Sequence, residues 1–343
     1  MKFYTLKVVE IRQETADSIT LCFKQPGLRK IQYLAGQYLT LIFRINGRRY
    51  IRPYSFSSAP AVDKLLEVTV KRIHNGIVSN YIHDTISVGD SVEVMQPIGD
   101  FVHSIPANEI FLWGIGSGIT PLISLAKQIL VTDEIAKVNL IYGNRNYEST
   151  IFMNQLLNFS KLYPHRFLVS HFHTQLKVNP TIPGLIEGRI DREKALYILR
   201  ELNQENLSLH YICGPAGFKD SVKDALRIIG IDDCFVFSED FELIKNPEDL
   251  QDIHTQQVKL KFENSEFNLE VVKGQTILES ALDAGIELPY SCQTGNCSTC
   301  KGRLLNGEVK MIGLSKKRDD LLFDEYLICC AHPVTNNVYI EII

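Results

Sequence analysis

Four cysteines near the end of the chain have a spacing suited to one-electron chemistry. Cys292, Cys297 and Cys300 follow a C-x4-C-x2-C pattern, and Cys330 comes after 29 further residues. This spacing is typical of a [2Fe–2S] cluster, in which each iron takes tetrahedral thiolate ligands. A loop with Gly295 and small polar residues can wrap closely around such a cluster, and its backbone N–H groups can donate hydrogen bonds to the sulfurs. The pattern therefore predicts a centre that moves single electrons.

Other uses of these cysteines fit the sequence less well. Zinc ribbons commonly pair two C-x2-C knuckles, and this chain has one such pair. A disulfide framework is typical of short exported chains, whereas this chain has 343 residues and its N-terminus lacks a signal-peptide pattern. Cys329 competes with Cys330 for the fourth ligand position. Because neighbouring residues of a strand face opposite ways, we expect only one of the two to reach the cluster.

The composition favours an ordinary globular protein. Apolar residues make up 45% and charged residues 22% of the chain, and the net charge is −4. A nucleic-acid partner would need a basic stripe, so we do not expect one. The longest apolar runs, such as the one beginning at Ile110, are far too short to span a bilayer. With eight cysteines and no export signal, we expect a reducing cytoplasm.

Changes in sequence pattern divide the chain into three folded regions. Residues 1–104 are rich in alternating, β-branched segments, and Asn46-Gly47 is a strong hairpin signal, which together predict an antiparallel barrel or sandwich. Residues 105–241 alternate strand and helix patterns, which predicts a parallel sheet. Residues 242–256 are polar and unpatterned, as in a linker. Residues 257–343 begin with two strands and a helix that precede the cysteine loop.

Two motifs in the first region suit a flavin. In Arg52-Pro-Tyr54-Ser55 the arginine can pair with a diphosphate, the tyrosine can lie flat against the isoalloxazine ring, and the serine hydroxyl can bond flavin N5. In the second motif a strand ends, Gly76 turns the chain, and a helix begins near Ser79, which creates an anion site. Taken alone, these motifs fit equally a strand with a surface arginine and a capped helix with no ligand.

Glycine-containing loops in the second region suit a dinucleotide. One loop follows a buried strand and opens a helix at Pro121, although its spacing differs from the Rossmann fingerprint. A second loop, Cys213-Gly214-Pro215, ends a later strand of the same predicted sheet. Ligands of open α/β sheets bind at the carboxyl ends of the strands, so we expect both loops to face one site.

The order of the motifs carries a resemblance that no single motif does. The chain resembles the ferredoxin–NADP reductase family over essentially its whole length. The resemblance lies in the order of its motifs, which is R-P-Y-S, G-x-x-S-N, G-x-G-S-G-I-T-P, Y-G-N-R, C-G-P and F-S-E-D-F. The C-terminal cysteine region resembles a plant-type ferredoxin domain. This combination is similar to the reductase components of multicomponent oxygenases, above all the phenylacetyl-CoA epoxidase reductase type. The resemblance implies a multidomain fold: an antiparallel β-barrel flavin domain, an α/β nucleotide domain and an α+β β-grasp ferredoxin domain.

The resemblance also implies roles for individual residues. The flavin and its phosphates would be held by Arg52, Tyr54, Ser55, Val70, Lys71, Gly76, Val78 and Ser79. The nicotinamide nucleotide would be held by Gly116, Ser117, Gly118, Thr120, Gly214 and Pro215. The residues nearest the hydride transfer would be Ser55, Cys213 and the segment from Glu239 to Phe241 that closes over the flavin, in which either Glu239 or Asp240 could face the ring. The cluster ligands would be Cys292, Cys297, Cys300 and Cys330, since Tyr326-Leu-Ile-Cys-Cys330 matches the ferredoxin pattern with Cys330 as the ligand.

Cofactor choice rests on two further details. Arg145 falls where this family binds the adenosine 2′ position. An arginine there suits a 2′-phosphate, whereas an acid would bind a ribose diol, so Arg145 favours NADPH over NADH. The alternative is that Arg145 is a solvated surface residue. Phthalate-dioxygenase-type reductases share the domain order and use FMN. Val70-Lys71-Arg72 followed by G-x-x-S-N more closely resembles the FAD subgroup, so we expect FAD.

The function implied is electron transfer from NADPH through FAD and a [2Fe–2S] cluster to a partner oxygenase, as in the phenylacetyl-CoA epoxidase system. One alternative is the reductase of a ring-hydroxylating dioxygenase or a desaturase, with the same internal chemistry. A different alternative is a redox sensor, in which turnover is incidental. A flavohaemoprotein is not expected, because no globin-length helical segment precedes the flavin region.

Overall fold

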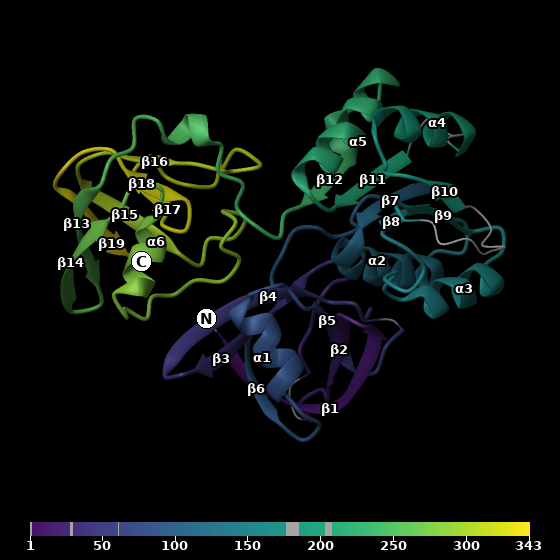
Figure 1. Ribbon diagram of the computed structural model, residues 1–343, viewed down its shortest axis with the longest axis horizontal. Helices are drawn as coiled ribbons and strands as arrows, with labels where there is room; N and C mark the ends of the chain where they lie inside the picture. The colour runs from purple at the N-terminus through teal and green to yellow at the C-terminus, as the bar shows by residue number, and fades with distance from the viewer. Residues whose placement is uncertain (1, 28–29, 61, 176–184, 203–207) are drawn as a thin grey trace. The chain divides into compact units, whose positions relative to one another are not determined.

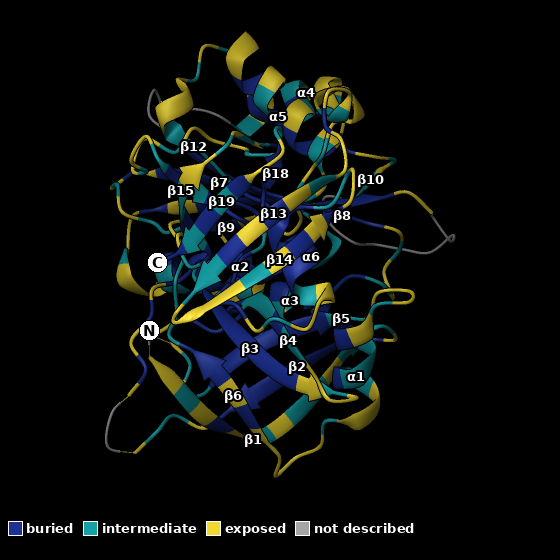
Figure 2. Ribbon diagram, turned by 90° about the vertical axis from the view of Figure 1, so that its left-hand side faces the viewer, coloured by how far each residue is buried: buried dark blue, intermediate teal, exposed yellow. Residues whose placement is uncertain are grey.

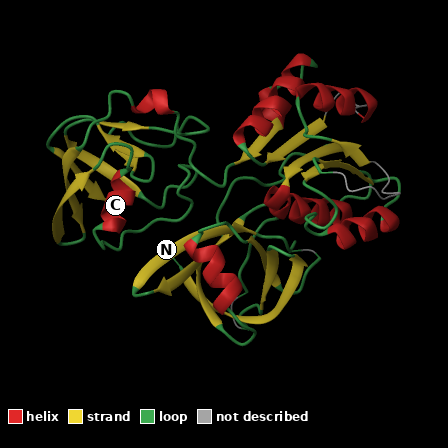
Figure 3. Cartoon of the chain, in the orientation of Figure 1, coloured by secondary structure: helices red, strands yellow, loops and turns green. Residues whose placement is uncertain are grey.

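The described chain forms two compact units. The computed structural model describes all residues except 1, 28–29, 61, 176–184 and 203–207. The first unit combines Met1–Ile42 with Tyr54–Glu239, and the second combines Phe43–Pro53 with Asp240–Ile343. Figure 3 shows strands throughout the chain, with helices concentrated in its middle region.

An antiparallel β-barrel occupies the N-terminal region. Its six strands are β1 (Phe3–Thr15), β2 (Ser18–Phe23), β3 (Tyr38–Ile45), β4 (Arg48–Ser55), β5 (Leu66–Lys71) and β6 (Ser91–Met95). They form one sheet in the order β4-β3-β6-β1-β2-β5, and an antiparallel bridge between Phe56 and Val68 joins its edges. Every residue of β2 is buried, and Figure 2 shows β2 and β3 mostly in dark blue. Closing the sheet leaves β4 and β5 without a free edge along this bridge, as expected for a barrel.

Two local predictions in the barrel are confirmed by the backbone. Asn46 and Gly47, between β3 and β4, both have positive φ angles of 51° and 79°, which is the conformation of the tight hairpin turn that Asn-Gly favours. Helix α1 (Ile77–Thr85) follows β5 and begins directly after Gly76.

A parallel six-stranded sheet forms the middle of the chain. Its strands are β7 (Glu109–Ile115), β8 (Lys137–Asn144), β9 (Phe167–His173), β10 (Leu185–Glu187), β11 (Ser208–Cys213) and β12 (Val236–Glu239), in the order β10-β9-β8-β7-β11-β12. Side chains alternate between its faces: Ile110 and Leu112 join one core, while Phe111 and Trp113 join the other. Helices α2 (Ile119–Thr132) and α3 (Met153–Leu162) cover the first face, and α4 (Arg192–Leu202) and α5 (Ala216–Ile228) cover the second (Figure 1).

Parts of this sheet were not expected from the sequence. The predicted strand–helix alternation is confirmed for β7, β8, β9 and β11. The apolar runs of β7, β8 and β11 are buried on both faces, whereas Leu168 of β9 is exposed. Strands β10 and β12 at the sheet edges are three and four residues long, too short to show a period. Helix α4 is amphipathic but strongly polar, with Ala195, Ile198 and Leu199 as its buried residues.

The second unit contains a five-stranded sheet beside one helix. Strands β13 (Gln256–Phe262), β14 (Ser265–Val271), β15 (Lys301–Asn306), β17 (Glu325–Leu327) and β19 (Val338–Ile342) are ordered β14-β13-β19-β15-β17. Only the β13–β19 pairing is parallel among those described, and β16 (Val309–Met311) pairs with β18 (Ala331–Pro333). Helix α6 (Ile277–Asp283) starts at a capping box in which Thr276 and Glu279 satisfy each other's backbone N–H groups.

The polar stretch 242–256 is partly folded. A short 3-10 helix covers Pro247–Leu250, where the Asn246 side chain accepts the Glu248 N–H, and Ile253 is buried. None of the helices in the described part of the chain is long and apolar enough to cross a membrane.

Candidate functional site

The cysteine loop has the hydrogen bonding that a thiolate-bound cluster requires. The Cys292 Sγ accepts the backbone N–H of Thr294 at 3.5 Å and that of Cys297 at 3.3 Å. The Cys292 and Cys297 sulfurs lie 3.0 Å apart. Cys292 and Cys300 are buried and Cys297 is half-buried. Backbone donors aimed at a ligand sulfur stabilise thiolate charge, so the loop fits the predicted cluster.

Gly295 makes the tight wrapping of this loop possible. Its φ angle is +75°, and a Cβ at this position would overlap the Leu314 side chain and stand 3.5 Å from Cys330 Sγ. Gln293 has a positive φ of 59° as well. A glycine admits both this backbone conformation and the close approach of the fourth cysteine to the loop.

Alternation along a strand does not decide between Cys329 and Cys330. Both residues lie in a turn between β17 and β18, so the alternation of side chains expected from the sequence does not apply to them. Both are buried. Cys330 lies against Gly295, whereas the Cys329 side chain contacts the Cys300 thiol. Cys330 as the fourth ligand therefore stays a prediction. In the described residues, no group of three or more His, Cys, Asp or Glu side chains forms a ready-made metal site.

The R-P-Y-S motif lies at the end of β4. Ser55 is buried, and Arg52 and Tyr54 are half-buried. Arg52 Nη1 donates to the carbonyl of Ile51 at 2.8 Å. A guanidinium has five N–H donors, so Arg52 can bond its own strand and a polar ligand of the predicted type at the same time.

The Gly76–Ser79 turn has the close packing expected of a phosphate-binding turn. A Cβ on Gly76 would stand 2.6 Å from Ser79 Oγ, so a side chain at this position would displace the Ser79 hydroxyl. Ser79 Oγ accepts the N–H of Ile73 at 3.1 Å, and Val78 and Ser79 are both buried. The Asn80 side chain donates to the Gly76 carbonyl at 2.6 Å. These bonds hold the first turn of α1 in place, where the backbone N–H groups of a helix start can bind an anion.

The structure brings the β5 end of the barrel to the glycine loop of the parallel sheet. Lys71 Nζ lies 3.9 Å from the position that a Cβ of Gly116 would take. The Tyr142 hydroxyl donates to the Gly116 carbonyl at 2.8 Å, and Thr120 Oγ1 donates to the Ser117 carbonyl at 3.1 Å. A predicted flavin-binding lysine and a predicted nucleotide loop are thus neighbours.

The two predicted nucleotide loops meet, as expected for one site at the carboxyl edge. A Cβ on Gly118 would overlap the backbone carbonyl of Cys213. A Cβ on Gly214 would stand 2.8 Å from the Phe218 ring. Val70 is buried, and Pro215 at the start of α5 is exposed. The two loops can pack this closely only because glycine lacks a side chain.

Cys213 and Glu239 are register partners at the ends of β11 and β12, and Gly114 pairs with Cys213 from the other side. Burial, followed by the nearby Glu239 carboxylate, raises the pKa of the Cys213 thiol well above its usual value. A neutral, buried thiol suits the non-nucleophilic role that the sequence predicted.

Lys219 is a member of this edge that sequence reasoning missed. It lies in the first turn of α5 and is 6% exposed. Burial, followed by the nearby ammonium of Lys223, lowers the pKa of the Lys219 ammonium, and the carboxylates of Asp220 and Glu239 partly offset this. Its signal in the sequence was its place four residues after Pro215, within the turn that follows the C-G-P motif.

A buried polar joint in the first unit was also missed. Ser124 and Lys127 on α2 donate to the carbonyls of Ser58 and Ser57, at 2.6 and 2.9 Å. Lys127 also pairs with Asp63 at 3.0 Å, and its side chain is 2% exposed. Helix α2 therefore begins at the glycine loop and, further along, holds the segment that directly follows the R-P-Y-S motif.

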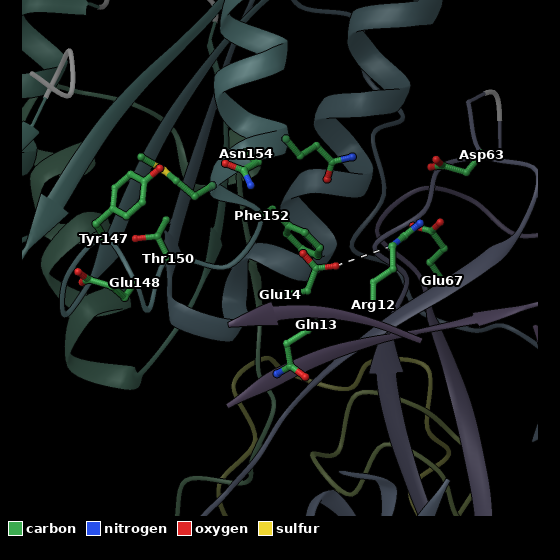
Figure 4. A pocket seen from close by; sticks show the side chains of 12 residues that line it. Arg12, Gln13, Glu14, Asp63, Glu67, Tyr147, Glu148, Thr150, Phe152 and Asn154 are labelled. Carbon is green, nitrogen blue, oxygen red and sulfur yellow. Dashed lines mark ion pairs between the residues drawn. The ribbon is translucent and has the colours of Figure 1, made fainter. Parts of the chain in front are cut away.

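A cavity of about 380 Å³ lies beside this joint, between β1 and the segment that leads into α3 (Figure 4). It is lined from β1 by Arg12 and Glu14, and Arg12 pairs with Glu67 at 2.7 Å. None of the cofactor residues predicted from the sequence lines it. Its acidic wall is unsuited to a phosphate-bearing cofactor.

Within the second unit, the part of the β3–β4 hairpin from Phe43 to Pro53 contacts the cysteine region. The Ile51 N–H donates to the Tyr290 hydroxyl at 3.2 Å, and the Ile51 carbonyl accepts from Gln293 at 3.3 Å. Arg44 and Glu287 form a two-bond ion pair at 2.9 and 3.3 Å. Ile51 precedes Arg52 of the flavin motif, and Tyr290 and Gln293 flank Cys292.

The remaining predicted residues are more open. Arg145 follows β8 and is exposed, and Phe241 is 49% exposed. An exposed Arg145 is compatible with a 2′-phosphate contact and with a solvated side chain, so its role stays a prediction.

The fold and these sites together define a flavin-dependent reductase with an iron–sulfur domain, and comparison with known proteins agrees. Three family models match in order: the oxidoreductase FAD-binding domain over residues 5–103, the oxidoreductase NAD-binding domain over 112–224 and the 2Fe-2S iron-sulfur cluster binding domain over 260–334. The predicted fold class is confirmed.

Curated relatives match along nearly their whole length. The ferredoxin reductase component of 3-ketosteroid-9-alpha-monooxygenase from Rhodococcus rhodochrous is 34% identical, over 98% of this chain and 96% of the relative. One of the subunits of 1,2-phenylacetyl-CoA epoxidase from Escherichia coli is 31% identical, over 99% of this chain and 97% of the relative. The chain therefore belongs to the family of NAD(P)H oxidoreductases with FAD and [2Fe–2S] domains that form the reductase components of oxygenase systems.

A solved structure shows the same fold over the full length. Phthalate dioxygenase reductase, described as a modular structure for electron transfer from pyridine nucleotides to [2Fe-2S], superimposes with a TM-score of 0.69. It is 24% identical and the match covers 99% of this chain and 98% of that one. The family model that matches residues 5–103 is one for FAD, as the sequence predicted.

Proposed function

We propose that this reductase takes electrons from NADPH and delivers them to a partner metallo-oxygenase of the phenylacetyl-CoA epoxidase kind. The observation that supports this most is the cysteine loop in a chain that matches the epoxidase relative from Escherichia coli from end to end. Bound FAD supplies the conversion of a two-electron hydride into single electrons, and the [2Fe–2S] cluster carries them one at a time. The domain boundaries that we propose are residues 104, 241 and 256.

We assign the following work to the chain's own residues. Arg52 and the first turn of α1 bind the flavin phosphates, and Tyr54 supports the ring. Ser55 donates a hydrogen bond at the reacting edge of the ring. Cys213, held neutral by burial, packs beside the nicotinamide without giving or taking a proton. Glu239 supplies negative charge at the end of β12, beside Cys213.

The NADPH preference is assigned to Arg145. Its exposed position after β8 suits a contact with a 2′-phosphate, which a planar guanidinium can bind with two hydrogen bonds. We also propose a reducing compartment, in which the four cysteines outside the cluster stay as thiols.

The first test is an anaerobic titration of the iron-replete protein with NADPH and, separately, with NADH. Flavin and cluster absorbance are followed, and frozen samples are examined by EPR. We expect both centres to be reduced, with NADPH effective at the lower concentration. An intact cluster that stays oxidised while the flavin bleaches would contradict the relay.

A matched pair of variants tests the coenzyme assignment. Arg145→Ala should raise the KM for NADPH and leave the KM for NADH unchanged, because only the phosphate contact is lost. Arg189→Ala, which removes a different arginine of the same region, serves as the control. Equal effects of Arg145→Ala on both coenzymes would contradict a 2′-phosphate contact.

The partner is tested by coupled turnover. The reductase is mixed with a purified phenylacetyl-CoA epoxidase oxygenase and, separately, with a 3-ketosteroid monooxygenase oxygenase, since a relative of each kind exceeds 30% identity. Product formed per NADPH consumed identifies the acceptor. Rapid NADPH oxidation without product in either mixture would direct the search to another oxygenase, such as a ring-hydroxylating dioxygenase. Turnover too slow to support any oxygenase would favour a redox sensor.

A further inference from the structure

The guanidinium of Arg318 donates hydrogen bonds to the cysteine loop. Its Nη1 donates to the Gly295 carbonyl and to the Cys297 carbonyl, the latter at 3.3 Å. Its Nη2 donates to Ser298 Oγ at 2.7 Å. One side chain therefore holds three positions of the loop, two of them by the backbone, around the predicted ligand Cys297.

Asp320 completes this arrangement. Its two carboxylate oxygens accept from Arg318 Nε and Nη2, both at 2.7 Å. All three guanidinium nitrogens are thus engaged, and the Arg318 side chain is 5% exposed whereas that of Asp320 is 56% exposed. A two-bond pair with a carboxylate orients the planar guanidinium, so the carboxylate faces solvent and the cation faces the loop.

The charge of Arg318 reaches the predicted ligands. Its guanidinium donates to the carbonyl of the predicted ligand Cys297 at 3.3 Å, and an arginine stays a cation at all relevant pH values. A cluster gains one negative charge when it is reduced. A cation held beside it at low exposure favours the reduced form, since net charge and hydrogen bonding set cluster potentials.

Neighbouring charges do not share this geometry. Lys317 is 87% exposed and pairs with Asp319, also exposed, at 2.7 Å. Lys301 pairs with Glu325 at 2.8 Å, and Arg303 pairs with Asp324 at 3.4 Å. Arg318 differs from these three cations because it also donates to backbone carbonyls of the cysteine loop, which orient it toward the cysteines.

We propose that Arg318, oriented by Asp320, is a positioning residue that keeps the [2Fe–2S] loop closed and raises the reduction potential of the cluster. This rests on the assignment of Cys292, Cys297 and Cys300 as ligands. The proposal has two parts that can be tested separately. The hydrogen bonds from Arg318 to Gly295, Cys297 and Ser298, called the fork below, retain the cluster, and the positive charge of Arg318 raises its reduction potential.

The test uses the full-length holoprotein with Arg318→Gln, Arg318→Lys and Asp320→Asn, and Lys317→Gln as the matched control. Midpoint potentials come from EPR-monitored redox titrations. Cluster loss is followed by visible absorbance in the presence of an iron chelator, with iron and sulfide content measured at the start.

Arg318→Gln should lower the equilibrium constant for cluster reduction about tenfold, which is about 59 mV for a one-electron couple. It should also speed cluster loss by roughly 10- to 100-fold, the usual effect of losing a supporting contact at a metal site. Arg318→Lys should keep most of the potential and lose the cluster faster, because it retains the charge and loses the fork. Lys317→Gln should match the wild type in both measurements.

Asp320→Asn should shift the reduction potential of the cluster in the opposite direction to Arg318→Gln. Removing this carboxylate takes away negative charge near the cluster, so the potential should rise while the fork loosens. General loss of structure would not produce opposite shifts in the two variants. If Arg318→Gln retains too little cluster to titrate, Arg318→Lys and Asp320→Asn still test the charge.

The proposal is overturned if Arg318→Gln and Lys317→Gln have the same potential and the same rate of cluster loss. It is also overturned if Arg318→Gln and Asp320→Asn shift the potential in the same direction. Wild-type protein that binds no iron and sulfide would instead refute the ligand assignment, and the starting analysis of iron and sulfide detects that separately.

Discussion

The cluster loop and the predicted flavin–nucleotide region differ in how their binding residues are brought together. Three of the four predicted cluster ligands fall within nine residues, Cys292 to Cys300. The predicted flavin and nucleotide residues of the first unit come from segments as distant as Tyr54, Gly118 and Glu239. The first site is organised by one loop with its own backbone hydrogen bonds, whereas the second is assembled by packing between a barrel and a sheet.

This difference shows in the residues that support each site. The loop is held by Gly295 and by Arg318, both within 26 positions of Cys292. In the predicted flavin–nucleotide region, Lys127 joins α2 to Ser57, 70 positions away. A local site tolerates changes elsewhere in the fold, while a site made of distant segments depends on the joint between them.

The largest effect is expected from a variant that removes the cluster site alone. Cys297→Ser should abolish electron transfer to cytochrome c and spare the reduction of ferricyanide by the flavin, because the cluster is lost while the first unit is untouched. Both activities are measured with the same NADPH concentration. Equal loss of both would contradict the separation of the two regions.

The next largest effect is expected from a variant that breaks the buried contact of Lys127 in the first unit. Lys127→Met leaves Asp63 and Glu67 without their buried cation, and breaking a buried pair costs about 3 to 5 kcal/mol. We expect this loss in the free energy of unfolding, together with slower flavin reduction. Denaturant unfolding and stopped-flow absorbance measure the two quantities.

Ser124→Ala is the milder companion of that variant. It removes one buried hydroxyl donor to the Ser58 carbonyl and should cost about 1 to 3 kcal/mol, since the carbonyl loses its partner. An unchanged rate of flavin reduction in both variants would show that the joint supports stability without positioning the flavin.

A matched pair of glycines tests the meeting of the two nucleotide loops. Gly118→Ala places a Cβ on the backbone of Cys213, whereas a Cβ on Gly217 meets nothing within 4 Å. Gly118→Ala should therefore cost about 1 to 3 kcal/mol and weaken NAD(P)H binding, as expected for overpacking. Gly217→Ala should leave both unchanged or slightly improved. Binding is measured by fluorescence titration.

The smallest effect concerns the reactivity of one thiol. Burial raises the pKa of Cys213, so its reactive thiolate stays scarce as the pH rises from about 7 to about 9. We expect exposed Cys234 to be alkylated by iodoacetamide first, although Asp232 raises the pKa of that thiol also. Mass spectrometry of peptides gives the order. Early alkylation of Cys213 in the folded holoprotein would contradict its description as a buried, neutral group.

The sequence by itself determined the chemistry of the local motifs. The cysteine spacing, the Asn46-Gly47 turn and the alternation of buried strands with helices all depend on residues near one another in the chain, where periodicity and turn preference act directly. The order of the motifs then identified the family and the FAD-binding class.

Only the tertiary structure decided which distant residues support those motifs. Lys127 and Arg318 carry no local signal, and Lys219 has only its place after the C-G-P motif, because an isolated cation in a sequence is most often a solvated one. Packing buries each of them and gives it carbonyl or charged partners. The turn at Cys329 and Cys330 shows the same limit: a rule for strands failed there because the fold bends the chain at the residues to which the rule was applied.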